Sequence, residues 1–253
     1  MVLAALKKGL KIYGISEHHP RPPFLRYKTD PPGEIRGKIR FPEFLQEMDI
    51  LKKEFAGKLE LLKASEFDWC GKANLALWRE WRAETDWDYV IGSVHFLAGW
   101  GFDYLQDWEE GRAKFSSLAE IYERYFAEVQ SMITEGQDFF QIVGHLDLIK
   151  KFIRPAPDLL KFVLPVLDAL AETNLILEVS SAGFVKDCRE QYPSLRILRA
   201  AREREIPLIF NSDAHEKTRL AQNFDELTEI ARAAGYTSRI ILRTGGERMV
   251  VSL

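Results

Sequence analysis

The chain has 253 residues, of which 46% are hydrophobic and 29% charged, and its formal net charge is −3. This composition predicts a globular protein, and the balance of 35 basic against 38 acidic residues argues against nucleic acid as a partner. Two cysteines in unrelated contexts exclude a disulfide scaffold, and the most apolar stretch, Leu159–Leu170, is too short to span a membrane, so we expect a cytoplasmic protein.

Apolar runs alternate with helical patterns along the whole chain, which predicts one α/β domain over residues 1–253 with a parallel sheet, closed or open. The proline-rich stretch Arg21–Ile39 is expected to form a long loop, of the kind that is usually a functional lid or disordered. In chain order, the expected strands are Lys11–Ser16, Leu59–Ser65, Tyr89–Val94, Gln141–Gly144, Leu175–Val179, Pro207–Phe210, Arg239–Leu242 and Met249–Leu253. The expected helices are residues 3–10, Phe41–Phe55, Leu118–Ile133, Asp158–Thr173, Ser194–Glu205 and Phe224–Ala234.

Polar side chains that bind metals follow the carboxyl ends of several predicted strands, and all five histidines fall at such places. A lone histidine beside a strand is more often packed or solvated, but in a (β/α) barrel these ends meet at one mouth, which carries the active site. Imidazoles and carboxylates without cysteine suit Zn, Mn or Fe(II), and a carboxylate shared by two ions makes a hydrolytic centre. The residues are His18, His19, Glu66, Asp68, His95, His145, Asp147, Asp213 and His215.

Six segments carry a resemblance to a known family. GISEHHP, ASEFDW, DYVIGSVHFL, IVGHLDLIKKF, LEVSSAGF and NSDAH, in this order, resemble the polymerase-and-histidinol-phosphatase (PHP) superfamily, and more narrowly its histidinol-phosphate phosphatases. The resemblance runs from about Ala4 to the C-terminus. It implies a distorted, TIM-like (β/α)7 barrel, up to three divalent metals, and hydrolysis of L-histidinol phosphate, a small-molecule phosphate ester, in histidine biosynthesis. An oligomer is compatible with it.

The chain departs from the family at one motif, because the HxH that ends the family's first strand has no counterpart here. We therefore expect the first barrel strand to be missing and fewer than three metals to bind. On a strand, His19 points away from His18, which favours a role in the second layer around the metals, in substrate binding or in a lid. The resemblance implies that Glu66 bridges two metals, with Asp213 on the first, His95 and His145 on the second, and His18 and His215 on the third.

Hydrolysis of a phosphate ester also needs cations that bind the phosphate. Lys150 is the first choice, followed by Arg154 and Lys186, with a solvated basic side chain as the alternative for each. Glu66, Asp213, Lys150 and Arg154 are therefore the candidate catalytic residues. Trp100 and Phe102 follow His95 closely enough to line a pocket for an imidazole-bearing substrate, whereas Glu178 is expected to have a structural partner rather than to bind the substrate amine.

Other hypotheses remain open from the sequence. The chain could be an N-terminally truncated or metal-impaired PHP-like protein with little activity, and exposed strand edges would then favour aggregation or strand exchange. An amidohydrolase-like (β/α)8 enzyme uses similar ligands, but the SVHFL and GHLDLIK segments argue against it. A DNA-processing exonuclease is disfavoured by the charge balance.

Overall fold

A six-stranded parallel sheet forms the centre of the molecule. The computed structural model describes residues 1–22, 24–30, 40–83 and 85–253. The strand order, β1-β2-β3-β6-β7-β8, follows the order of the chain, as in a barrel, and each strand falls on one that the sequence predicted. The strands are β1 (Ile12–His18), β2 (Glu60–Asp68), β3 (Tyr89–Ser93), β6 (Ile142–Val143), β7 (Ile176–Ser180) and β8 (Leu208–Asn211).

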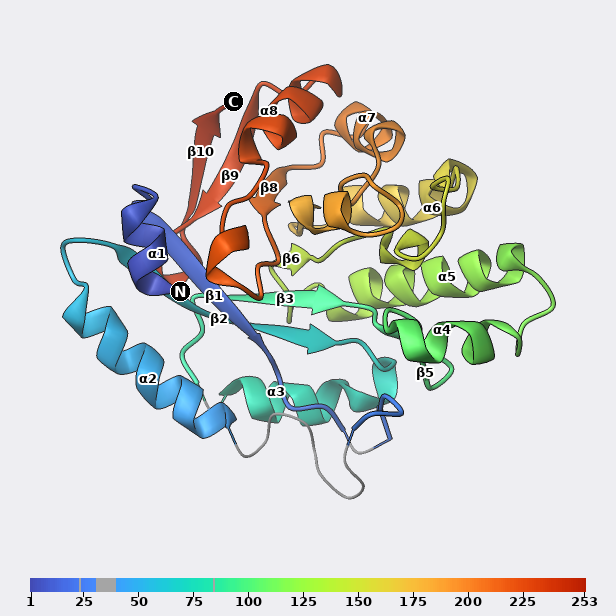
Figure 1. The fold of residues 1–253 in the computed structure, drawn as a ribbon, viewed down its shortest axis with the longest axis horizontal. Helices are drawn as coiled ribbons and strands as arrows, with labels where there is room; N and C mark the ends of the chain where they lie inside the picture. Colours follow the sequence, from blue (N-terminus) through green and yellow to red (C-terminus); the bar gives the residue numbers. More distant parts are fainter. Residues whose placement is uncertain (23, 31–39, 84) are drawn as a thin grey trace.

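Helices surround this sheet (Figure 1). The six predicted helices are confirmed, and two more, α3 and α4, are present. The helices are α1 (Val2–Lys7), α2 (Phe41–Glu54), α3 (Leu75–Ala83), α4 (Leu105–Arg112), α5 (Leu118–Gly136), α6 (Leu160–Ala171), α7 (Leu195–Glu203) and α8 (Phe224–Ala233). Two antiparallel pairs join β4 (Phe96–Leu97) to β5 (Trp100–Gly101) and β9 (Ser238–Leu242) to β10 (Arg248–Ser252). The 3₁₀ helices are η1 (Lys72–Asn74), η2 (Leu148–Lys150), η3 (Ser181–Val185), η4 (Lys217–Arg219) and η5 (Thr244–Gly246).

The sheet curls around an apolar interior, as expected of a TIM-like barrel. One hydrophobic cluster holds an inward-facing residue from each of the six strands, together with two residues of β9. Because both edge strands, β1 and β8, contribute to the same cluster, the sheet bends toward closure. The prediction that a first strand is missing stays a prediction. The cluster contains Ile12, Leu62, Ile91, Ile142, Ile176, Ile209, Ile240 and Leu242.

The outer face of the sheet packs against the helices. Helix α5 is the longest and buries Ile121, Tyr125 and Val129, which are spaced four residues apart along one face. Its first turn is capped by Ser117, whose hydroxyl accepts a hydrogen bond from the backbone N–H of Glu120. Such amphipathic faces explain why the helices lie outside the curled sheet.

The register of the parallel strands brings polar residues to one end of the barrel. His18 of β1 pairs with Glu66 of β2, and the backbone N–H of His19 continues the ladder to the carbonyl of Glu66 at 2.8 Å. Side chains alternate between the two faces of a strand, so His18 and Glu66 face inward and His19 faces outward. The strand ends thus supply the site, as the sequence predicted.

The predicted proline-rich loop lies partly outside the described residues, at Pro23 and residues 31–39. Its described parts pack against the protein. Arg21 is buried and forms an ion pair with Asp30 at 3.1 Å, and the ring of Tyr27 packs against that of Phe96, with 4.8 Å between the ring centroids. Within the described residues, no helix combines the length and apolar character that a membrane crossing needs.

Asp88, a buried carboxylate at the amino end of β3, anchors the C-terminal hairpin. It accepts hydrogen bonds from the ammonium of Lys52 at 2.6 Å, the backbone N–H of Lys63 at 2.7 Å and the backbone N–H of Gly245 at 2.8 Å. These three donors belong to α2, β2 and η5. One side chain therefore joins the sheet to the hairpin that carries the β9 residues of the interior.

We expect Asp88→Ala to lower the free energy of unfolding by about 3 kcal/mol, because it removes three hydrogen bonds and leaves the buried N–H of Lys63 without a partner. Urea unfolding followed by circular dichroism measures the change. Glu60→Ala is the matched control: Glu60 also binds the hairpin, through Arg243 and Thr244, but its contacts are more exposed, so we expect a loss under about 1 kcal/mol. Equal losses in the two variants would contradict this role of Asp88.

Candidate functional site

Three strands bring one carboxylate and two imidazoles together at the carboxyl end of the sheet. Glu66 lies on the inward face of β2, two residues before that strand ends, while His95 and His145 each lie two residues past the end of β3 and β6. The Nε2 atom of His145 lies 3.1 Å from a carboxylate oxygen of Glu66 and 3.1 Å from Nε2 of His95. The same Glu66 oxygen accepts a hydrogen bond from the hydroxyl of Ser93. All three side chains are buried.

This cluster fits a divalent metal. One ligand atom from each of Glu66, His95 and His145 lies within 4.8 Å of the others. Burial raises the pKa of Glu66, but the charge of His18 and the hydrogen bond from His145 hold it well below its ordinary value, so the carboxylate is ionised. Two imidazole nitrogens that face each other and an ionised carboxylate are the donor set expected for Zn, Mn or Fe(II).

A buried carboxylate behind the cluster orients His95. Asp68 binds Nδ1 of His95, which directs Nε2 toward Glu66 and His145. Asp68 in turn lies 3.7 Å from the guanidinium of Arg21. Burial lowers the pKa of His95, but the charge and hydrogen bond of Asp68, with smaller effects of other carboxylates, raise it to about 10. A carboxylate behind a ligating histidine fixes the ring and makes it a stronger ligand.

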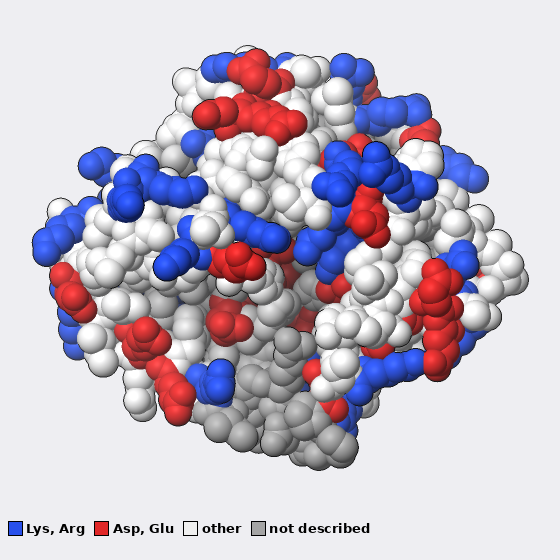
Figure 2. Space-filling view, viewed as in Figure 1, with Lys and Arg blue, Asp and Glu red and all other residues white. Residues whose placement is uncertain are grey.

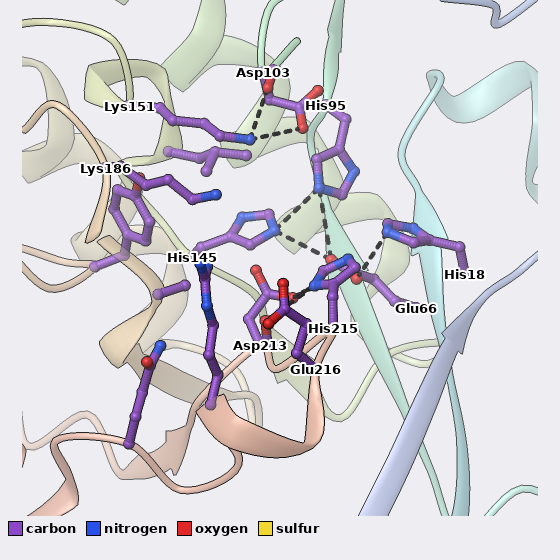
Figure 3. A pocket seen from close by; sticks show the side chains of 15 residues that line it. His18, Glu66, His95, Asp103, His145, Lys151, Lys186, Asp213, His215 and Glu216 are labelled. Atoms are coloured by element: carbon purple, nitrogen blue, oxygen red, sulfur yellow. Dashed lines mark hydrogen bonds and ion pairs between the residues drawn. The ribbon is translucent and has the colours of Figure 1, made fainter. Parts of the chain in front are cut away.

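The remaining predicted ligands lie at the rim of the same cavity, which has a volume of about 200 Å³. His18 Nε2 is 3.7 Å from the second oxygen of Glu66. Asp213 and His215 follow β8, and Nδ1 of His215 is 3.6 Å from the Asp213 carboxylate. Figure 3 shows all three directed at the space beside Glu66. Among the described residues, neither Asp213 nor His215 joins a group of three closely spaced ligands.

Basic side chains approach the cavity from the side opposite His18 (Figure 3). Lys151, Lys186 and Arg219 line it. Lys151 donates to the backbone carbonyl of Asp103 at 2.7 Å and to its carboxylate at 3.2 Å. Burial, and then the charge of Lys151, lower the pKa of Lys186. In Figure 2 this face is hollowed, with acidic atoms in the hollow and basic side chains around it.

The structure corrects the first choice for the phosphate contact, Lys150. Its side chain is fully buried, and its ammonium lies 2.8 Å from Asp147, 2.6 Å from Glu190 and 2.9 Å from the carbonyl of Gln191. The reason is the short helix η2, in which successive side chains point about 120° apart. The neighbouring Lys151 therefore faces the cavity while Lys150 serves the fold.

Three further candidates also lie away from the cavity. Arg154 is exposed and does not line it. Trp100 is buried, and its indole donates to the carbonyl of Asp107 at 2.9 Å. His19 stacks on Phe67 at 4.0 Å between ring centroids, and burial lowers its pKa to about 4. His19 is thus a neutral part of an aromatic cluster on the outer face, which corrects its assignment to substrate binding.

The sequence analysis missed several residues that line the cavity. Asp103, Lys151, Tyr192, Glu216 and Arg219 all do so. The feature of the sequence that could have indicated them is their proximity to the predicted site: each lies within about eight residues of a predicted ligand or candidate cation. Nearness along the chain did not show which of two adjacent lysines faces inward.

Comparisons with known proteins agree with this geometry. The PHP domain family matches residues 1–182. This chain belongs to the PHP domain family. It is 35% identical over 238 residues to a protein of Deinococcus radiodurans named "probable histidinol-phosphatase", covering 92% of this chain and 86% of the relative. The histidinol-phosphatase of Bacillus subtilis is 27% identical over 227 residues, covering 84% of each chain. The resemblance to the histidinol-phosphatase branch is confirmed.

A solved structure shares the fold of this PHP protein. The histidinol phosphate phosphatase of Lactococcus lactis, solved as a complex with Zn, L-histidinol and phosphate, superposes with a TM-score of 0.75 at 19% identity. The match covers 98% of this chain and 90% of the other. The barrel-type fold expected from the sequence is thereby confirmed.

We expect Zn²⁺ binding at pH 8 to release about one proton from His95, because an imidazole with a pKa near 10 is protonated there and must be neutral to bind a metal. Calorimetric titration in two buffers of different ionisation enthalpy counts the protons. Asp68→Asn removes the largest influence that raises this pKa, so the release from His95 should fall toward zero. Asp49→Asn changes an exposed carboxylate of α2 that does not line the cavity, so it should leave the proton release unchanged. Identical apparent enthalpies for the unchanged protein in both buffers would contradict the prediction.

Proposed function

We propose that this chain is a metal-dependent phosphoric monoester hydrolase that converts L-histidinol phosphate to L-histidinol and phosphate. One observation carries the proposal: a buried carboxylate–imidazole cluster and three cations line the same cavity. Metal ligands on one side and cations on the other are what hydrolysis of a phosphate ester needs. The histidinol-phosphatase relatives give the substrate.

Glu66, His95 and His145 would hold one divalent metal, and Asp213, His18 and His215 would add ligands at the rim. When bound, such a metal supplies a Lewis acid for the phosphoryl oxygens and lowers the pKa of water. Asp68 keeps Nε2 of His95 directed at the cluster. Zn is the metal recorded with the Lactococcus lactis relative, and Mn or Fe(II) suits the same donors.

The cations at the opposite wall would bind the phosphate oxygens. Lys186 and Arg219 line the cavity, and Lys151 is held in place by Asp103. Fixed positive groups beside a transferring phosphoryl group neutralise the charge that builds on its oxygens. Glu216 lines the exposed rim of the cavity, and its carboxylate would bind the ammonium group of the substrate.

A metal-poor protein with little activity is the second candidate. One observation favours this candidate: among the described residues, Asp213 and His215 belong to no group of three closely spaced ligands. The number of metal ions per chain, measured by mass spectrometry of the purified protein, separates the two. Two or three ions support the phosphatase, while none or one after incubation with Zn, Mn or Fe(II) supports the metal-poor form.

We expect Glu66→Gln to reduce phosphate release from L-histidinol phosphate at least about 100-fold, because the variant removes the carboxylate around which the ligands gather. The unchanged protein should lose activity with a chelator and regain it when Zn, Mn or Fe(II) is added. Glu60→Gln, the same exchange at the other end of the sheet, should retain activity. Normal turnover by Glu66→Gln would overturn the proposed function.

We expect Lys186→Ala to lower kcat/KM about 10- to 100-fold while leaving the urea midpoint almost unchanged, because Lys186 lines the cavity. Lys150→Ala should instead destabilise the protein and lower the urea midpoint, since Lys150 is buried among Asp147, Glu190 and Gln191. Lys161→Ala, on the exposed face of α6, is the control for both measurements. A Lys186 variant with normal kinetics would contradict this assignment.

A further inference from the structure

A buried glutamate lies beneath the ligand cluster, and neither the predicted chemistry nor the lining of the cavity uses it. Glu178 faces inward from β7, is 2% exposed and is not among the residues that line the cavity. Among the described residues, no basic nitrogen forms an ion pair with its carboxylate. The inward-facing position two residues earlier holds Ile176. An apolar side chain at Glu178 would avoid the cost of burying a charge.

The carboxylate of Glu178 instead begins a chain of hydrogen bonds that connects two candidate ligands. One oxygen accepts the backbone N–H of His145 at 2.6 Å. The other accepts a hydrogen bond from the side-chain amide of Asn211 on β8. The amide oxygen of Asn211 accepts the backbone N–H of Asp213 at 3.1 Å. Three adjacent strand ends, those of β6, β7 and β8, are thus joined through two side chains.

The direction of each hydrogen bond in this chain is fixed. Both ends are backbone N–H groups, of His145 and Asp213, which can donate but not accept. Between these two N–H groups, the series of hydrogen bonds needs one side chain that accepts twice and one that both donates and accepts. Glu178 and Asn211 supply this pair. The backbone of Asp213 is in the left-handed region, with φ at 44°, where an unsupported non-glycine residue is uncommon.

We propose that Glu178 and Asn211 are a positioning pair that sets the placement of His145 relative to Asp213 and thereby the affinity of the site for its metal. Neither residue touches the substrate. The pair acts through the backbones of the two residues it holds. The inference rests on the proposed function, because the metal concerned is the one that would serve hydrolysis. The affinity for the metal is nevertheless measured without substrate.

An exchange of the two functional groups tests the pair. In Glu178→Gln the new NH₂ group faces a donor, either the His145 N–H or the Asn211 amide, and in Asn211→Asp two carboxylates face each other. The double variant Glu178→Gln, Asn211→Asp restores every bond: the glutamine oxygen accepts from His145, its NH₂ donates to Asp at 211, and that carboxylate accepts from Asp213. The charge of the pair is also kept.

We expect each single variant to weaken Zn²⁺ binding at least about 10-fold, and the double variant to bind within about threefold of the unchanged protein. Competition with a chromophoric chelator measures the affinity, and the visible absorption of the Co²⁺-loaded protein reports the ligand geometry. Glu60→Gln, a carboxylate-to-amide exchange at the far end of the sheet, should change neither. Urea midpoints of the metal-free proteins show whether a variant is folded.

Two results overturn the proposal. One is unchanged Zn²⁺ affinity in both single variants. The other is a double variant that binds as weakly as the weaker single variant, whether it is folded or not, because restored bonds should restore the site. If a single variant fails to fold, recovery of the Co²⁺ spectrum in the double variant supports the pair. A protein that binds Zn²⁺ as described but releases no phosphate from L-histidinol phosphate refutes the proposed function and leaves the pair in place.

Discussion

The site depends on a buried negative charge at the carboxyl end of β2. Glu66 is ionised in a place that water hardly reaches, and such a charge is tolerated when positive or hydrogen-bonding groups surround it. The surrounding groups come from three segments of the chain, which supply His18, then Ser93 and His95, and then His145. Because parallel strands end at the same edge, one carboxylate can gather partners that are far apart in sequence. The register of β1 on β2, which pairs His18 with Glu66, is therefore as important to the site as any ligand.

Around this charge the protein is built in layers. The candidate metal ligands line the cavity, and behind them lie carboxylates that other side chains hold in place. Asp68 holds the ring of His95, and Arg21 reaches Asp68 from the segment after β1. Asp103 holds Lys151 at the opposite wall. His95 and Lys151 are thus each held by a carboxylate of the protein, which limits how far either side chain can move toward the other.

Much of this could be predicted from the sequence because it follows from short-range rules. Apolar runs located the strands, and polar residues at their ends located the cavity. The alternation of side chains along a strand correctly placed His19 on the face opposite His18. His19 packs there against the rings of Phe67 and Trp81, and this contact depends on packing between distant segments. The choice between Lys150 and Lys151 depended on the rotation of a single short helix, which composition and spacing do not reveal. Helix α3, which buries Leu75 and Trp78, was not among the predicted helices.

The C-terminal hairpin has a consequence for how the protein is made. The barrel interior includes Ile12 near the beginning of the chain and Leu242 near its end, and Asp88 fastens the hairpin to the sheet. A ribosome releases these segments one after the other, so the apolar interior stays uncovered at one end until β9 has emerged. Contacts between residues so far apart in sequence form slowly, and uncovered apolar surface promotes aggregation in the meantime. The core is therefore complete only once β9 has packed against the interior of the sheet.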